Sequence, residues 1–217
     1  RKPINIAFDA AGRLWVTETI EYPYPAKPGQ GRDAVKILED FGPDGRARKI
    51  TTFADKLNIP IGVMPDTDGK GALIYDIPNI RRFRDTDGDG KADKNEVYYS
   101  SFGFKDTHGM TGEFVRGFDG WIYACHGFAN TSNVKSKDGS TSISMTSGNT
   151  YRIKPDGSRI EKYTTGQVNP FGIAIDPYGN LFTADCHSRP LTMLLRGGWY
   201  ESFARPHDGL GFAPHLN

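Results

Sequence analysis

The chain has 217 residues, of which 37% are hydrophobic and 12% aromatic, and its formal net charge is +1. This length suits a folded protein with a sizeable core, and the near-neutral charge argues against a general attraction to nucleic acid or anionic membranes. No apolar run is long enough to cross a bilayer, and the 26 glycines and 14 prolines are typical of a turn-rich β protein.

One phrase recurs along the chain: a short apolar strand, an Asp/Gly turn and a second apolar strand that ends on a polar residue. Three copies are clear and a fourth is weaker; they lie at residues 5–18, 68–76 (the weaker one), 118–126 and 172–185. The equivalent positions Leu14, Leu73, Ile122 and Leu181 are 59, 49 and 59 residues apart. Repetition at about 40–50 residues, somewhat exceeded here, is typical of sheets arranged around one axis.

The sequence therefore predicts an all-β fold, a β-propeller in which about four blades are present. We expect a single domain over residues 1–217, either a small closed ring or most of a larger one, and the abrupt C-terminal sequence favours the larger ring. Strands rich in β-branched and aromatic residues are expected at residues 14–17, 34–38, 72–75, 96–99 and 150–153. Residues 130–148, which are rich in Ser, Thr and Lys, are expected to form a long loop.

The most specific local motif lies at residues 85–96 and matches the calcium pattern Asp-x-Asp-x-Asp-Gly-x5-Glu at every position. Ca²⁺ prefers six to eight oxygen ligands. The flanking segments are predicted strands, so we expect a structural calcium loop inserted in a β-hairpin. An acidic turn without a metal is the alternative. Asp85, Asp87 and Asp89 are expected to supply carboxylates, and Lys91 a backbone carbonyl. Asp93 is expected to bind directly or through water, and Glu96 through both carboxylate oxygens.

A second group of candidates follows from the repeat. Glu18, His126 and Asp185 occupy the same place in three copies, four residues after the aligned apolar position. In a propeller the inner strands line a central channel, so these residues are expected to converge there and to bind substrate or adjust acid–base chemistry. The alternative is that strand ends near an axis are polar because they meet water.

A third candidate is His108 in Asp106-Thr107-His108, which lies in a polar loop before a predicted inner strand and could act as a general base. A hydrogen-bonded structural histidine is the alternative. The two cysteines, Cys125 and Cys186, end equivalent strands. They could pair, but two separate thiols are the preferred interpretation.

Six segments occur in a characteristic order along the chain, at residues 85–93, 106–108, 118–123, 169–174, 179–182 and 206–214. In these segments the chain resembles the glucose/sorbosone dehydrogenase family of soluble quinoproteins. It resembles still more closely the propeller of the large "membrane-bound dehydrogenase" proteins of planctomycetes and relatives. This resemblance implies a six-bladed propeller, pyrroloquinoline quinone and Ca²⁺ as cofactors, a sugar or polyol substrate, a cytochrome c electron acceptor and an extracytoplasmic, for example periplasmic, location.

By position, the resemblance implies that His108 is the catalytic base and that Asn169 belongs to the cofactor-binding loop. Two neighbours differ from the family pattern, because Val168 stands for an Arg and Phe171 for a Gln. A trianionic quinone needs cationic partners, so these two differences favour a non-catalytic propeller. The resemblance and His108 favour a quinone-linked sugar or polyol dehydrogenase, which is the predicted function. The alternatives are a non-catalytic, calcium-stabilised propeller that binds a carbohydrate or a protein and, less favoured, hydrolysis of a lactone.

Overall fold

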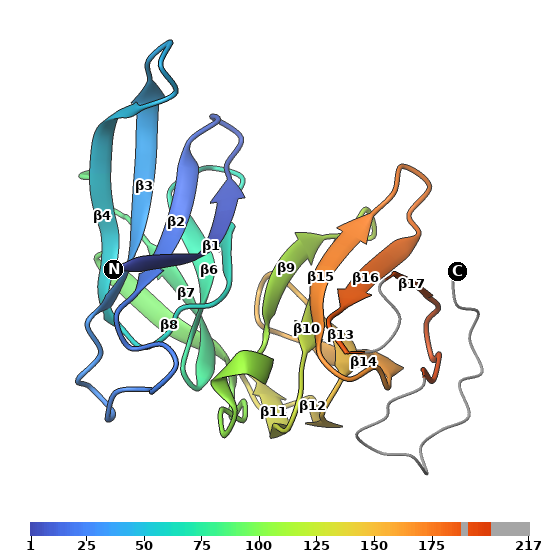
Figure 1. Ribbon diagram of the computed structural model, residues 1–217. Helices are drawn as coiled ribbons and strands as arrows, with labels where there is room; N and C mark the ends of the chain where they lie inside the picture. Colours follow the sequence, from blue (N-terminus) through green and yellow to red (C-terminus); the bar gives the residue numbers. More distant parts are fainter. Residues whose placement is uncertain (188–190, 201–217) are drawn as a thin grey trace. The chain divides into compact units, whose positions relative to one another are not determined.

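The computed structural model describes residues 1–187 and 191–200 and confirms the all-β fold (Figure 1). The chain forms two compact units, Arg1–Val97 and Tyr98–Asn217. In the described part of the chain the one helical element is a 3-10 turn, η1 (Thr107–Gly109). Within these same residues no helix has the length and apolar character needed to span a bilayer.

The first unit is built from antiparallel strands, and four of them form a sheet in the order β1-β2-β3-β4. Strands β5, β6 and β7 follow in a second sheet, and β8 begins in this unit and ends in the next. The bounds are β1 (Lys2–Phe8), β2 (Leu14–Thr19), β3 (Asp33–Phe41), β4 (Ala47–Leu57), β5 (Val63–Pro65), β6 (Gly71–Asp76), β7 (Asn79–Arg84) and β8 (Lys94–Ser100).

Alternation along the strands produces the core of the first unit. Strand β2 alternates between half-buried and buried residues, as the period of two in a β-strand requires. The ring of Trp15 on this strand meets the ring of Phe53 edge-on, with centroids 4.6 Å apart. Val35, Ile37 and Val63 belong to the same buried cluster. The edge-on contact between Trp15 and Phe53 adds roughly 1 kcal/mol to the stability that their buried area contributes.

The second unit contains a four-stranded antiparallel sheet in the order β14-β13-β10-β9 and a three-stranded sheet in the order β15-β16-β17. A hairpin of β11 and β12 pairs with the last residues of β8. The bounds are β9 (Gly112–Arg116), β10 (Ile122–His126), β11 (Thr131–Ser136), β12 (Ser142–Thr146), β13 (Asn149–Ile153), β14 (Ile160–Thr165), β15 (Pro170–Ile175), β16 (Leu181–Asp185) and β17 (Thr192–Leu194).

The expectation of a long loop at residues 130–148 is wrong, because this segment forms the β11–β12 hairpin. Five cross-strand pairs join the two strands, from Thr131↔Thr146 to Lys135↔Ser142. Along β11, exposed and buried residues alternate strictly, and two of the buried positions are Ser132 and Ser136. The strand buries small hydroxyl side chains where strands usually bury aliphatic ones, so its hydrophobic pattern is too weak to be seen in the sequence.

The recurring phrase folds as predicted, with the same turn in all three clear copies. Asp9, Asp119 and Asp176 each accept a hydrogen bond from the backbone N–H two residues later, at 3.0, 3.2 and 2.9 Å. The glycine that follows has a φ between 76° and 88° in each copy, at Gly12, Gly120 and Gly179. A positive φ is costly for other residues, which explains why this residue type recurs.

Candidate functional site

His108 lies in η1, the turn that precedes β9 in the second unit. Asp106 caps this turn: its Oδ1 atom accepts the N–H of His108 at 2.9 Å and lies 2.9 Å from Nδ1 of the same residue. The side chain of His108 is 64% exposed. When Nδ1–H donates to the carboxylate, Nε2 carries the lone pair, which is the tautomer that a general base needs.

Two buried asparagines hold this turn in place. The Nδ2 atom of Asn130 donates to the carbonyls of Asp106 and Gly109, at 2.7 and 2.9 Å, and its Oδ1 accepts the N–H of Asp106 at 3.0 Å. The Nδ2 atom of Asn169 donates to the carbonyl of His108 at 3.2 Å. Three carbonyl groups of the turn are thus fixed by side chains that come from other parts of the unit.

Asp185, at the end of β16, shapes the segment that carries Asn169. Its carboxylate accepts the backbone N–H groups of Val168 at 2.7 Å, Asn169 at 3.0 Å and His187 at 3.0 Å. The residue is buried. These contacts place Asp185 beside Asn169, and through it near His108, so three of the predicted site residues belong to one hydrogen-bonded network.

His126, at the end of β10, is fully buried, with both ring nitrogens occupied. Its Nδ1 atom lies 2.7 Å from the carbonyl of Ser147, and Nε2 lies 2.7 Å from the hydroxyl of Ser132. Burial lowers the pKa of His126 to about 4, and the carbonyl bond opposes this only in part. The imidazole is therefore neutral at pH 7. Its bond to Ser132 joins the end of β10 to β11 of the hairpin.

Glu18 lies in the first unit, on β2, and forms ion pairs with Lys36 at 3.0 Å and with Arg1 at 3.5 Å. The convergence of Glu18, His126 and Asp185 on one channel, and their contact with substrate, stay predictions. The sequence pattern did not reveal the roles of Asp106 and Asn130. Asp106 could have been found from its spacing to His108, whereas Asn130 gives no local signal because its partners lie 21 and 24 residues away.

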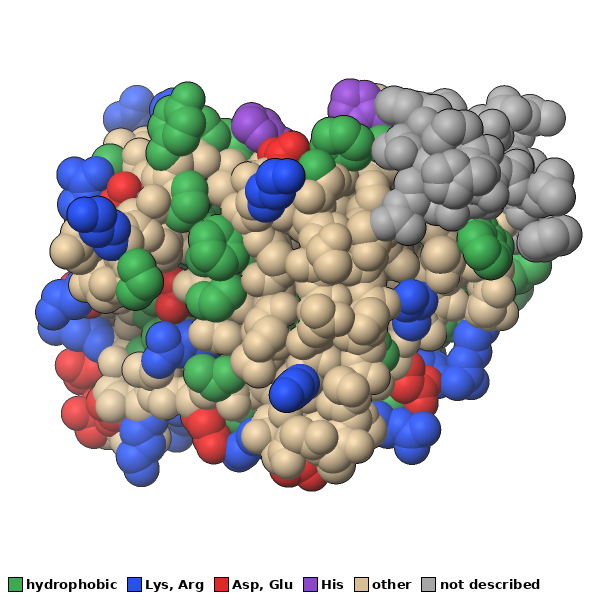
Figure 2. Space-filling view, turned by 90° about the horizontal axis from the view of Figure 1, so that it is seen from below, with side chains coloured by type: hydrophobic (Ala, Val, Ile, Leu, Met, Phe, Trp, Pro, Cys, Tyr) green, Lys and Arg blue, Asp and Glu red, His purple; other side chains and the backbone are tan. Residues whose placement is uncertain are grey.

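The groups around this network are aromatic or titratable. The half-buried Phe128 and the exposed His187 have ring centroids 6.4 Å apart, and Cys186 is an exposed thiol. The second thiol, Cys125, is buried and is not paired with it, so the interpretation as two separate thiols is confirmed. Figure 2 shows histidine side chains at the surface, and His108 and His187 are the exposed histidines among the described residues.

The predicted calcium loop lies in the first unit, between β7 and β8. Carboxylate oxygens of Asp85, Asp87 and Asp89 lie within 4.8 Å of one another. Gly88 and Gly90 both have a φ of 85°, which lets the loop fold back on itself. Asp85 is buried, which by itself raises the pKa of its carboxyl, but hydrogen bonds from Gly88 and Gly90 leave that pKa below its usual value. These three residues present oxygen ligands of the kind that Ca²⁺ prefers.

The other predicted calcium ligands are placed differently. The carboxylate of Asp93 accepts the N–H and the hydroxyl of Thr86, the latter at 2.6 Å. Glu96 lies on β8 with an exposed side chain, outside the three-residue group. A cavity beside the loop is lined by Asp85 and Asp89 and also by the cationic residues Arg13, Lys49 and Lys70, so it is not itself a cation site. The described residues therefore fit a metal through three carboxylates, and the roles of Lys91, Asp93 and Glu96 as ligands stay predictions.

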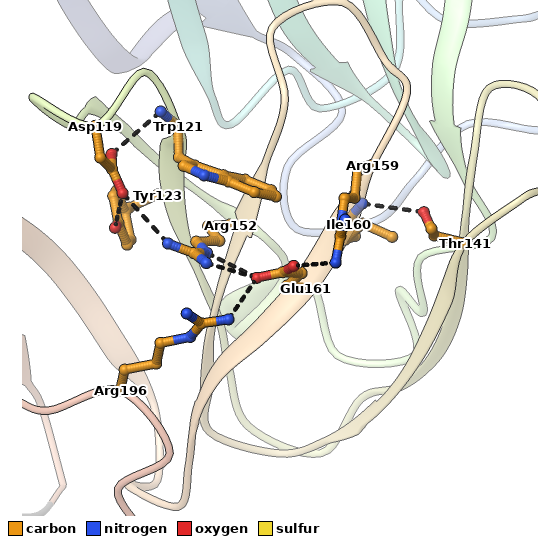
Figure 3. A network of polar contacts seen from close by, with 9 residues as sticks. All are labelled: Asp119, Trp121, Tyr123, Thr141, Arg152, Arg159, Ile160, Glu161 and Arg196. Atoms are coloured by element: carbon orange, nitrogen blue, oxygen red, sulfur yellow. Dashed lines mark hydrogen bonds and ion pairs between the residues drawn. The ribbon is translucent and has the colours of Figure 1, made fainter.

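A separate polar network braces the outer strands of the second unit (Figure 3). Arg152 on β13 donates to Glu161 on β14 at 2.6 and 3.0 Å and to Asp119 at 3.2 Å. Its guanidinium lies 4.2 Å from the ring centroid of Trp121. Arg159 and Arg196 also pair with Glu161. Together these contacts join the turn between β9 and β10 to the edge strand β14. We therefore infer that they stabilise the fold.

The repeated antiparallel sheets place the chain in the β-propeller fold, as the similarity to solved structures shows. The PQQ-bound aldose sugar dehydrogenase of Streptomyces coelicolor matches with a TM-score of 0.63 and 16% identity, over 100% of this chain and 67% of its own. The calcium structure of the Trichoderma reesei enzyme of carbohydrate-active family AA12 gives 0.57 and 12%, over 90% and 52%. The PQQ domain of Coprinopsis cinerea pyranose dehydrogenase gives 0.55 and 13%, over 84% and 43%.

Residues 1–209 match the family model described as "Domain of unknown function (DUF7133)", and the chain belongs to this family. No curated protein matches the chain. The chain spans between 43% and 67% of the length of the three solved structures. The segment at residues 206–214, which contributes to the quinoprotein resemblance, lies outside the described residues.

Proposed function

We propose that the chain is part of a sugar dehydrogenase-like propeller that oxidises a sugar or polyol, with His108 as the general base. One observation carries this proposal: Asp106 pairs with the exposed imidazole of His108, on a turn that two buried asparagines hold in place. The fold supports it, because propellers of the same type include a sugar dehydrogenase that binds PQQ.

The chemistry assigned to this chain is the proton half of the oxidation. Converting a C–OH group to C=O removes a proton from the hydroxyl and a hydride from the carbon. Nε2 of His108 accepts the hydroxyl proton, and the carboxylate of Asp106 stabilises the imidazolium that forms. General-base catalysis of this kind contributes roughly 10²- to 10⁴-fold to a rate. The pair also fixes the direction from which the hydroxyl must approach.

A bound redox cofactor supplies the hydride acceptor in enzymes of this type, but the described residues at the matching positions fit a quinone poorly. Val168 is fully buried and apolar, and Phe171 is half exposed. The amide of Asn169 is already bonded to other parts of the protein. These three positions offer no cation to a trianionic quinone. We therefore derive no step through that group.

The second candidate function is a non-catalytic, calcium-stabilised propeller that binds a carbohydrate or a protein. The loss of polar groups at Val168 and Phe171 favours it, because an exposed aromatic ring such as Phe171 suits packing against a ligand. In this case the exposed side chain of His108 would recognise a ligand without transforming it.

The two functions are distinguished by adding pyrroloquinoline quinone and Ca²⁺ to the purified protein and measuring dye-linked oxidation of aldoses and polyols. The dehydrogenase predicts cofactor uptake and activity that is lost in His108→Gln and retained in His187→Gln. Carbohydrate binding by calorimetry with no cofactor uptake and no dye reduction would instead establish the binding protein.

Calcium binding, a cytochrome c electron acceptor and an extracytoplasmic location belong to the same proposal. The three clustered carboxylates of the loop at residues 85–96 support calcium. The acceptor and the location rest on what the resemblance of the sequence implies. Mass-spectrometric identification of proteins that co-purify with the chain from its native host would test the acceptor.

A further inference from the structure

We infer that Asn169 is a positioning residue for His108, rather than the cofactor ligand that the quinoprotein resemblance implies. The inference concerns the turn that carries the proposed general base, and it rests on the proposed function. It follows from what the Asn169 amide contacts, from how the turn is held on both sides, and from how closely the surrounding backbone approaches that amide.

The amide of Asn169 is fully engaged within the protein. Its Oδ1 atom accepts the N–H of Phe128 at 3.1 Å. Its Nδ2 atom donates to the carbonyl of His108 at 3.2 Å and to Sγ of Cys186 at 3.5 Å. An amide nitrogen has two protons, so both donors are used. The residue is 5% exposed, which leaves little surface for a ligand.

These contacts control the backbone that carries His108. Asn169 holds the carbonyl of His108, while Asn130 holds the carbonyls of Asp106 and Gly109 on either side. With these carbonyls fixed, the peptide planes around His108 cannot rotate, and the imidazole is directed by the backbone as well as by Asp106. A catalytic group misplaced by about 1 Å can lose roughly 10²-fold in rate.

The segments around Asn169 pack too closely for the amide to turn outward toward a ligand. A Cβ atom at Gly127 would lie 2.0 Å from Oδ1 of Asn169, and one at Gly109 would lie 2.2 Å from the carbonyl oxygen of Phe128. The backbone N–H of Asn169 is held by Asp185 at 3.0 Å. Asn169 therefore joins the turn before β9, the segment after β10 and the segment after β16.

The test replaces Asn169 by Asp, which keeps the acceptor for Phe128 and removes the donors to His108 and Cys186. We expect kcat to fall roughly 10- to 100-fold with KM within about threefold. Amide exchange at His108 and Gly109 should become faster, the imidazole signals of His108 in NMR spectra should move, and the affinity for pyrroloquinoline quinone with Ca²⁺ should stay within about threefold.

Two further variants complete the test. Asn130→Asp should reproduce the kinetic and exchange changes, because it releases the same turn from the other side. Asn133→Asp is the matched control, since Asn133 is exposed on β11 and its Oδ1 atom accepts the hydroxyl of Ser144 at 2.7 Å, away from the turn. Should Asn169→Asp fail to fold, Asn169→Ala removes the same donors to His108 and Cys186 without adding a charge and should produce the same kinetic defect.

The inference is overturned if Asn169→Asp loses tenfold or more in quinone affinity while the exchange at His108 and the NMR signals of its ring stay unchanged. A wild-type protein without dehydrogenase activity would remove the proposed function but not this test. In that case faster exchange and moved His108 signals still support the positioning role, and their absence rejects it.

Discussion

The Oδ1 atom of Asp106 lies 2.9 Å from Nδ1 of His108 and accepts the backbone N–H of the same histidine, also at 2.9 Å. One carboxylate oxygen therefore fixes both the backbone and the ring of His108. The local spacing makes this possible, because a side chain that caps a turn reaches the N–H two residues later. Asp9, Asp119 and Asp176 cap turns in the same way, and at Asp106 the cap also orients an imidazole.

Asp106→Asn should lower kcat/KM for sugar oxidation by roughly 10²-fold or more, because an amide can cap the turn but cannot stabilise an imidazolium. Asp138→Asn is the control: Asp138 caps the β11–β12 turn through the N–H of Ser140 at 3.0 Å and has no histidine partner. A loss in Asp106→Asn no larger than in this control contradicts the proposed role.

The buried His126 predicts how stability depends on pH. Its pKa is lowered to about 4 in the folded protein, against a usual value near 6.5, so the unfolded chain binds a proton first as the pH falls. The free energy of unfolding should therefore decrease between about pH 6.5 and pH 4, by roughly 3 kcal/mol in total, and this contribution should level off at lower pH.

Urea unfolding at several pH values checks this for wild type and His126→Gln. The variant should lack this part of the pH dependence, so its deficit relative to wild type should be largest at pH 7 and should shrink toward pH 4. Carboxylates with lowered pKa values, such as Asp9, affect both proteins equally. Parallel pH profiles for the two proteins would show that His126 is not a neutral buried group.

Calcium should stabilise the first unit. At a concentration about 100 times Kd, binding to the folded state adds about 2.7 kcal/mol to the free energy of unfolding. Asp87→Asn should weaken the affinity at least about tenfold, because a charged ligand is lost while the side chain can still accept the N–H of Asp89. Isothermal titration calorimetry measures this.

Asp44→Asn is the matched control for the calcium loop, since Asp44 is an exposed turn residue that accepts the N–H of Arg46 at 3.2 Å. It should bind Ca²⁺ as wild type does. Absence of binding heat in the wild-type protein, or equal affinity in Asp87→Asn, would mean that the carboxylate cluster is only an acidic turn.

Arg152→Met should destabilise the second unit by roughly 2–3 kcal/mol, because it removes a cation that bonds Glu161 and Asp119 and covers the face of Trp121. The Arg152 side chain is only 10% exposed. Arg159→Met should cost less than about 1 kcal/mol, since Arg159 makes an exposed pair with the same Glu161. Thermal unfolding of both variants compares them, and equal losses would contradict this ranking.

Much of the fold could be predicted from the sequence because its strands and turns have strong local signals. The aligned residues Leu14, Ile122 and Leu181 all lie in strands, and the Asp/Gly turns before them have the expected caps and positive φ values. The β11–β12 hairpin could not be predicted, because its buried positions include Ser132 and Ser136 in place of aliphatic residues.

The site was less accessible to sequence reasoning because its contacts are long-range. His108 and Asn169 were identified as candidates, but the bond between them spans 61 residues. The polar end of a strand does not reveal whether its side chain faces solvent or a neighbouring segment. His126 is enclosed and bonds Ser132 and Ser147, whereas the side chain of His108 is exposed.

The most direct test of the account is kcat/KM for sugar oxidation in wild type and in His108→Gln, with His187→Gln as the control. The account predicts that kcat/KM is at least about 10²-fold lower in His108→Gln and within about threefold of wild type in His187→Gln, because a glutamine side chain cannot take up the hydroxyl proton. An equal kcat/KM in wild type and His108→Gln would contradict the assignment of His108 as the base.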